Sequence, residues 1–223
     1  MKKKFTMKKI NLLIALFLFM EVSAQYSGES RIGFTGNFHQ GSIVNVHDRS
    51  NGRYGGTLGV VAEIPIKSAD ITGGENIFLM PMVEYSMQGE NSTVNVAKWG
   101  RQKFHNDYVA AQLYLKYFFN PGRNLSEYFV FAGPRVEFLV REKRETSSQY
   151  ETTHFKFNHD DEINSLGIGV SVGVGTRVID NLEAFLRFDR GFSKVYPNAI
   201  NGVTYNRQLS VGVNYYLGGN RYY

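Results

Sequence analysis

Charged side chains that recur on one face of predicted β-strands are the residues of this chain most able to do chemistry. They lie in segments where apolar and polar residues alternate, and a strand points successive side chains to opposite faces. Buried charges need partners of opposite sign and satisfied hydrogen bonds. The sequence therefore predicts a network of ion pairs on the shared face. Its members are Arg31, Glu63, Glu84, Lys116, Arg135, Glu137, Glu183, Arg187 and Asp189.

Catalysis would need paired carboxylates or a serine with a histidine, and the spacing marks neither. Glu183 and Asp189 fall on one predicted strand, roughly 20 Å apart at the usual rise per residue, which is a poor separation for flanking one glycosidic bond. Ser42 is close in sequence to His39 and His47, but no spacing marks a nucleophile with its base and orienting group. We therefore expect no catalytic residue, with a lipid-modifying enzyme as an alternative.

The histidines lie in or next to predicted loops. His154 and His159 precede the acids of 160–162, and imidazole and carboxylate are plausible metal ligands. Their spacing matches no metal motif, so we expect no metal and no cofactor. Trp99 stands near Lys98 and Arg101, but one aromatic residue among cations is a weak signal for nucleic acid, which we do not expect as a partner.

Eight predicted strands must position these residues. The period of two is clearest in the last strand, where Leu209, Val211 and Val213 point one way and Ser210 and Asn214 the other. Each strand is long enough to cross a membrane when tilted. The predicted strands are about 31–40, 54–66, 77–88, 107–119, 127–141, 163–178, 182–194 and 205–217.

Short and long connections alternate between these strands, which is typical of outer-membrane barrels with short periplasmic turns and longer outer loops. A soluble β-sandwich would not need this rhythm. The sequence therefore predicts an all-β fold: an eight-stranded antiparallel transmembrane β-barrel of the outer-membrane type. The short links are 68–76, 120–126 and 179–181, and the long ones are 41–53, 89–106, 142–162 and 195–204.

The interior of an eight-stranded barrel is just wide enough to be filled by side chains. The near balance of inward charges, which Gln112 and Gln208 join, therefore predicts a self-neutralising polar plug. The alternative is a narrow pore or a site for a small charged solute. Inward glycines from Gly167 to Gly175 leave room for side chains of neighbouring strands, since a glycine within a strand removes bulk.

Some residues do not fit a regular barrel wall. Pro81 and Pro134 lie mid-strand, where we expect bulges or local breaks of the ladder. Arg190 has the outward phase, so it either reaches lipid headgroups or a bulge at Gly191 shifts the phase. Other outward residues are apolar, and an aromatic girdle is expected at the periplasmic rim. Its predicted members are Phe119, Tyr128 and Tyr215.

The N-terminus predicts an export signal. A basic start is followed by the apolar run 10–20 and by Val22-Ser23-Ala24, so cleavage is expected between Ala24 and Gln25. The signal would be 1–24 and the barrel domain 25–223. The chain carries a formal charge of +5, and residues 1–24 contribute five Lys and Glu21, a net +4, which leaves about +1. There is no cysteine, hence no disulfide.

The end of the last strand carries a resemblance to a known group of proteins. Ser210, Gly212, Tyr215 and Leu217 match a polar-x-Gly-x-x-aromatic-x-hydrophobic pattern. The chain resembles the PorT-like and OmpX-like small outer-membrane β-barrels over about 25–223. The resemblance implies that this strand is the insertion signal read by the barrel-assembly machinery, although 218–223 extend past the usual ending.

The resemblance also implies a location in the cell outer membrane, in contact with outer-membrane lipid and lipopolysaccharide. Some PorT-like members are implicated in protein secretion, and the group has no shared catalytic residues. We therefore expect a protein that acts through its outer loops or as an accessory of an envelope or secretion apparatus. The long loops 89–106 and 142–162 favour this hypothesis, because loops on a rigid scaffold often carry function.

Overall fold

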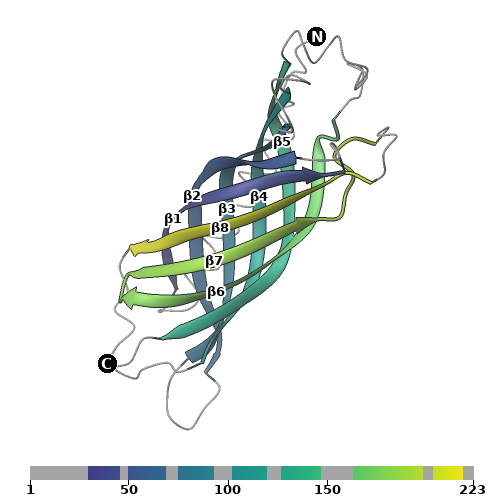
Figure 1. Cartoon of the computed structure of the whole chain (residues 1–223). Helices are drawn as coiled ribbons and strands as arrows, with labels where there is room; N and C mark the ends of the chain where they lie inside the picture. Colours follow the sequence, from purple (N-terminus) through teal and green to yellow (C-terminus); the bar gives the residue numbers. More distant parts are fainter. Residues whose placement is uncertain are drawn as a thin grey trace.

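A closed antiparallel β-barrel forms the body of the protein (Figure 1). The computed structural model describes residues 30–45, 50–68, 75–92, 102–119, 127–146, 163–197 and 203–217, so the predicted signal 1–24 lies outside the described residues. Each strand pairs with the next, and β8 pairs with β1, which confirms the predicted fold. The strands are β1 (Arg31–Val44), β2 (Ser50–Ser68), β3 (Glu75–Ser92), β4 (Gln102–Phe118), β5 (Tyr128–Thr146), β6 (Leu166–Ile179), β7 (Leu182–Gly191) and β8 (Tyr205–Leu217).

Strand ends differ from prediction by four residues on each side of the first connection. It spans 45–49 rather than 41–53, because β1 continues to Val44 and β2 already begins at Ser50. Polar residues such as Ser42 still pair with β8, opposite Arg207, since ladder hydrogen bonds need only the backbone. By contrast, β8 has the bounds that its alternation predicted. No helix in the described part of the chain is long and apolar enough to cross a bilayer.

The two mid-strand prolines break the ladder locally without shifting it. Pro81 lies in a gap of the β2–β3 ladder and Pro134 in a gap of the β4–β5 ladder, and the register is the same on both sides of each gap. On its other edge each proline keeps a register partner, Leu113 for Pro81 and Val170 for Pro134. The predicted breaks are confirmed and no bulge accompanies them, so the inward and outward phases are preserved.

The outer surface of the wall is apolar. Large exposed side chains follow the outward phase of the strands, as predicted, although Ala62, which has the same phase, is buried. Phe119, Tyr128 and Tyr215 are exposed at the end of the barrel where β1 begins and β8 ends. We call this end the turn end and the opposite one the loop end. Representative outward residues are Ile32, Leu58, Leu113, Leu115, Ile168, Val172, Leu186, Leu209 and Val211.

The inward glycines of β6 accept aromatic rings of β5. Gly173 is the register partner of Phe131, and Gly175 is the partner of Phe129. A Cβ at Gly175 would lie 2.3 Å from Cζ of Phe129 and 2.5 Å from the carbonyl oxygen of Ala184. The prediction that these glycines make room for neighbouring side chains is therefore confirmed.

Replacing one of these glycines should destabilise the barrel. We expect Gly175→Ala to lower the free energy of unfolding by about 1–3 kcal/mol, because the added methyl group overpacks the interior. The measurement is urea unfolding of the refolded protein, followed by the heat-modifiable shift on gels. The control is Gly56→Ala on β2, where the nearest atom to an added Cβ is 3.8 Å away. Equal stability of the two variants would contradict this packing.

Candidate functional site

The interior near the turn end holds four fully buried charges, which we call the turn-end cluster: Arg31, Glu63, Lys116 and Glu183. Nζ of Lys116 lies 2.6 Å from Oε2 of Glu63 and 2.6 Å from Oε2 of Glu183. Nη2 of Arg31 lies 2.7 Å from Oε1 of Glu63. Two cations therefore meet two carboxylates, and the cluster is neutral.

A second group of charges lies farther along the axis, and we call it the mid-barrel cluster: Glu84, Arg135, Glu137, Arg187 and Asp189. Oε1 of Glu84 accepts from Nη1 of Arg135 and from Nη2 of Arg187, each at 2.7 Å. Nε of Arg135 lies 2.5 Å from Glu137, and Nε of Arg187 lies 3.1 Å from Asp189. Gln112 donates to Glu84 at 2.8 Å. Two cations here face three carboxylates, so these five residues carry one excess negative charge.

Contacts of the mid-barrel cluster cross the full width of the interior. Arg187 is on β7 and Glu84 is on β3, and these strands stand opposite each other in the ring. A direct hydrogen bond between opposite walls leaves no open path at that level. The predicted charges are thus brought together, but in two clusters rather than one.

An apolar layer separates the two clusters. The expectation that the inward face is polar is wrong here, because most inward positions between the clusters carry aromatic, methionine or valine side chains, with buried Asn37 as a polar exception. On β7, for example, Phe185 lies between Glu183 and Arg187. The rings of Phe129 and Phe131 fit because the neighbouring strand β6 supplies Gly175 and Gly173 beside them. The buried apolar cluster is Val61, Phe78, Met80, Met82, Tyr114, Phe118, Phe129, Phe131, Phe185 and Tyr216.

His39 lies inside the barrel, which the sequence did not indicate. Its ring is buried, with Nε2 at 2.8 Å from the carbonyl oxygen of Met87 and Nδ1 at 3.2 Å from Oγ1 of Thr57. Ser42 has the opposite phase on β1, so these two residues do not form a nucleophile–base pair. In the described residues no group of His, Asp and Glu is arranged to hold a metal. His154, His159 and 160–162 lie outside the described residues.

The connection after β7 folds over the loop end of the interior. Val195 and Tyr196 pack with Ile43 and Phe104 in a small buried cluster. The backbone N–H of Asn164 donates to the carbonyl oxygen of Val195 at 2.8 Å. Burial in this cluster raises the pKa of Tyr196 to about 12. In the sequence, only the apolar pair 195–196 within an otherwise polar connection indicated that the described part of this connection packs over the interior.

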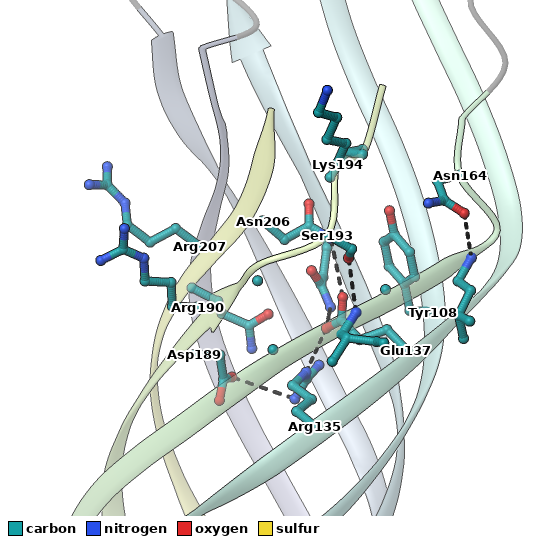
Figure 2. A pocket seen from close by; sticks show the side chains of 18 residues that line it. Tyr108, Arg135, Glu137, Asn164, Asp189, Arg190, Ser193, Lys194, Asn206 and Arg207 are labelled. Carbon is teal, nitrogen blue, oxygen red and sulfur yellow. Dashed lines mark hydrogen bonds and ion pairs between the residues drawn. The ribbon is translucent and has the colours of Figure 1, made fainter. Parts of the chain in front are cut away.

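A narrow recess, continuous with solvent, leads from the loop end toward the mid-barrel cluster (Figure 2). Arg135, Glu137 and Asp189 line its inner part. Nδ2 of Asn206 on β8 donates to Oε2 of Glu137 on β5 at 3.2 Å. Ser193 accepts from the backbone N–H of Ile168 at 2.9 Å, which ties the connection after β7 to the wall.

The four residues of the expected insertion signal take alternate faces of β8. Ser210 is buried inside, whereas Tyr215 and Leu217 are exposed on the outer surface. A Cβ at Gly212 would lie 2.6 Å from Cζ of Phe185, so packing of the interior requires glycine here. Recognition by the assembly machinery stays a prediction.

An apolar outer surface around a filled interior defines the class of small membrane-spanning β-barrels. A family model described as outer membrane protein beta-barrel domain matches residues 23–196. The chain belongs to this family and is located in the outer membrane of the cell.

Several solved outer-membrane proteins match the chain at low identity. The attachment invasion locus protein Ail of Yersinia pestis is 7% identical, with a TM-score of 0.47, and the match covers 85% of this chain and 99% of Ail. Neisserial surface protein A is 13% identical, with a TM-score of 0.43 and coverage of 83% and 96%. OprG from Pseudomonas aeruginosa is 12% identical, with a TM-score of 0.41 and coverage of 85% and 95%. No curated protein matches the chain.

The mid-barrel cluster predicts that substitutions at two arginines of β7 have very different effects on the free energy of unfolding. Arg187→Gln removes a cation that contacts both Glu84 and Asp189 inside the barrel. We therefore expect the free energy of unfolding to fall by about 3–5 kcal/mol. The control Arg190→Gln changes an exposed residue of the same strand and should stay within about 0.5 kcal/mol. Urea unfolding in one neutral detergent measures both. Equal effects would show that the cluster contributes little.

Proposed function

We propose that this protein is a non-conducting outer-membrane scaffold that acts through its loop end, either by binding a partner with its outer loops or as an accessory of an envelope or secretion apparatus. The contact of Arg187 with Glu84 across the barrel is the observation that carries the proposal. Because the interior is filled, the exposed ends are the surfaces left for function.

A pore through the barrel is poorly supported by these contacts. A passing ion would have to separate Lys116 from Glu63 and Glu183, which are fully buried. It would then have to cross the apolar layer and break the contacts of Glu84. Separating buried ion pairs is costly, because each charge is left without a partner. The recess at the loop end is therefore interpreted as a dead end.

The loop end offers an extended sheet for binding a partner. The ladder of β5 with β6 ends at the pair Phe138–Leu166, yet β5 continues to Thr146 and stays paired with β4. The teal ends of β4 and β5 extend past the ends of β7 and β8 (Figure 1). Charged residues such as Arg141 and Lys143 are exposed on this extension. Such a platform supports the outer loops, and a role in secretion like that of some PorT-like proteins fits the same surface.

A lipid-modifying enzyme has no support from the described residues. The nitrogens of His39 face Met87, Thr57 and Asn37 inside the barrel, and Ser42 is on the other face of its strand. Ser42 and His39 are therefore not brought together as nucleophile and base.

Planar-bilayer recording tests the closed interior. We expect no steady conductance from the refolded wild-type protein, because two ionic clusters and an apolar layer block the axis. The double variant Phe131→Ala, Arg187→Ala should show brief openings, provided that its heat-modifiable gel shift confirms folding. A steady wild-type current that the double substitution changes would contradict the scaffold.

Crosslinking in intact cells tests the role of the loop end. We expect that replacing 147–162 with a short Gly-Ser linker abolishes the crosslinked partners identified by mass spectrometry, while the barrel still folds. The matched control replaces 120–126, a connection at the turn end. If the loop variant retains the wild-type partner set, the proposed function is wrong.

A further inference from the structure

Two arginines stand directly opposite each other on the outer wall. Arg190 of β7 and Arg207 of β8 are register partners, and both side chains are exposed. Like charges at directly opposite positions of a sheet destabilise it. Within the described ranges neither guanidinium makes an ion pair with an acid of this chain. The pair therefore carries an unbalanced charge of +2.

The acids nearest in sequence belong to the interior. Asp189 points inward, where it contacts Arg187 and Arg135. Figure 2 shows Arg190 and Arg207 with their guanidinium groups directed away from Arg135 and Glu137. The two arginines thus face the surroundings of the barrel and not the mid-barrel cluster.

The pair lies near the loop-end margin of the apolar belt, where exposed Phe192 follows the end of β7 and Tyr205 begins β8. The next outward residues toward the turn end are Phe188 on β7 and Leu209 on β8, both exposed and apolar. Toward the loop end, β7 ends at Gly191. In an outer membrane, aromatic residues at this margin mark the headgroup region of the outer leaflet.

The site is also partly ordered. The guanidinium of Arg190 lies 5.2 Å from the ring centroid of Tyr205, a cation–π contact that holds the side chain against the wall. Lys194 follows in the connection after β7 and is exposed, so a third cation lies nearby in sequence. Guanidinium forks match the oxygens of a phosphate group and bind it with two parallel hydrogen bonds.

We propose that Arg190 and Arg207 bind the phosphate group of an anionic lipid of the outer leaflet, whose acyl chains lie along Phe188 and Leu209. The ligand supplies the negative charge that the wall lacks, and its apolar part matches the surface below the arginines. This site goes beyond the proposed function, because it does not depend on which partner the loops bind.

Native mass spectrometry of the refolded barrel tests the site with lipid A as the probe. We expect retention of bisphosphorylated lipid A to weaken about tenfold for each arginine removed, in Arg190→Gln, Arg207→Gln and the double variant. The control Arg141→Gln removes an exposed arginine that lies 3.5 Å from Asp107, and it should bind as the wild type does. Equal retention by the double variant and the wild type would overturn the proposal.

Two further probes separate a lipid site from a free-anion site. Dephosphorylated lipid A with the same acyl chains should bind at least tenfold more weakly, and inorganic phosphate at the same concentration should not displace lipid A. Displacement by inorganic phosphate, or equal binding of dephosphorylated lipid A, would contradict a lipid-phosphate site.

Stability should change in opposite directions in two environments. In a neutral detergent, Arg207→Gln should raise the unfolding midpoint slightly, since it relieves repulsion. In bilayers that contain bisphosphorylated lipid A, the same substitution should lower the midpoint, since a bound ligand stabilises the folded state. A purely structural arginine would shift both midpoints the same way, and that outcome would overturn the proposal.

Discussion

The narrow bore of an eight-stranded barrel is the constraint on which this structure depends. Its interior is just wide enough to be filled by side chains, so inward side chains must either meet or leave room for one another. Arg187 and Glu84 meet across the full width. Gly173 and Gly175 leave room for the rings of β5. Closure of the ladder and filling of the interior therefore follow from the same geometry.

The order of layers along the axis gives the protein a closed body with two different ends. The turn-end cluster is neutral and fully buried, and the apolar layer isolates it from the mid-barrel cluster. At the loop end, Val195 and Tyr196 cover part of the mouth, while β4 and β5 extend outward. This arrangement supports a rigid scaffold for loops better than a route for solutes.

Sequence reasoning predicted which face each residue takes better than it predicted height along the axis. The period of two placed Glu84, Arg187 and the β6 glycines inside, because phase is a local property of a strand. The stagger between strands is not local, so the split into two clusters could not be seen. His39 was assigned to a loop edge because β1 was predicted too short, and the aromatic layer was missed because a polar interior was assumed.

A double-mutant cycle between Glu84 and Arg187 tests the closed interior most directly. It compares Glu84→Gln, Arg187→Met and the double variant by urea unfolding in one detergent. If the two side chains bond across the barrel, their coupling should be about 2 kcal/mol or more. Effects that add to within about 0.5 kcal/mol would mean that the opposite walls do not meet, and the closed scaffold would be wrong.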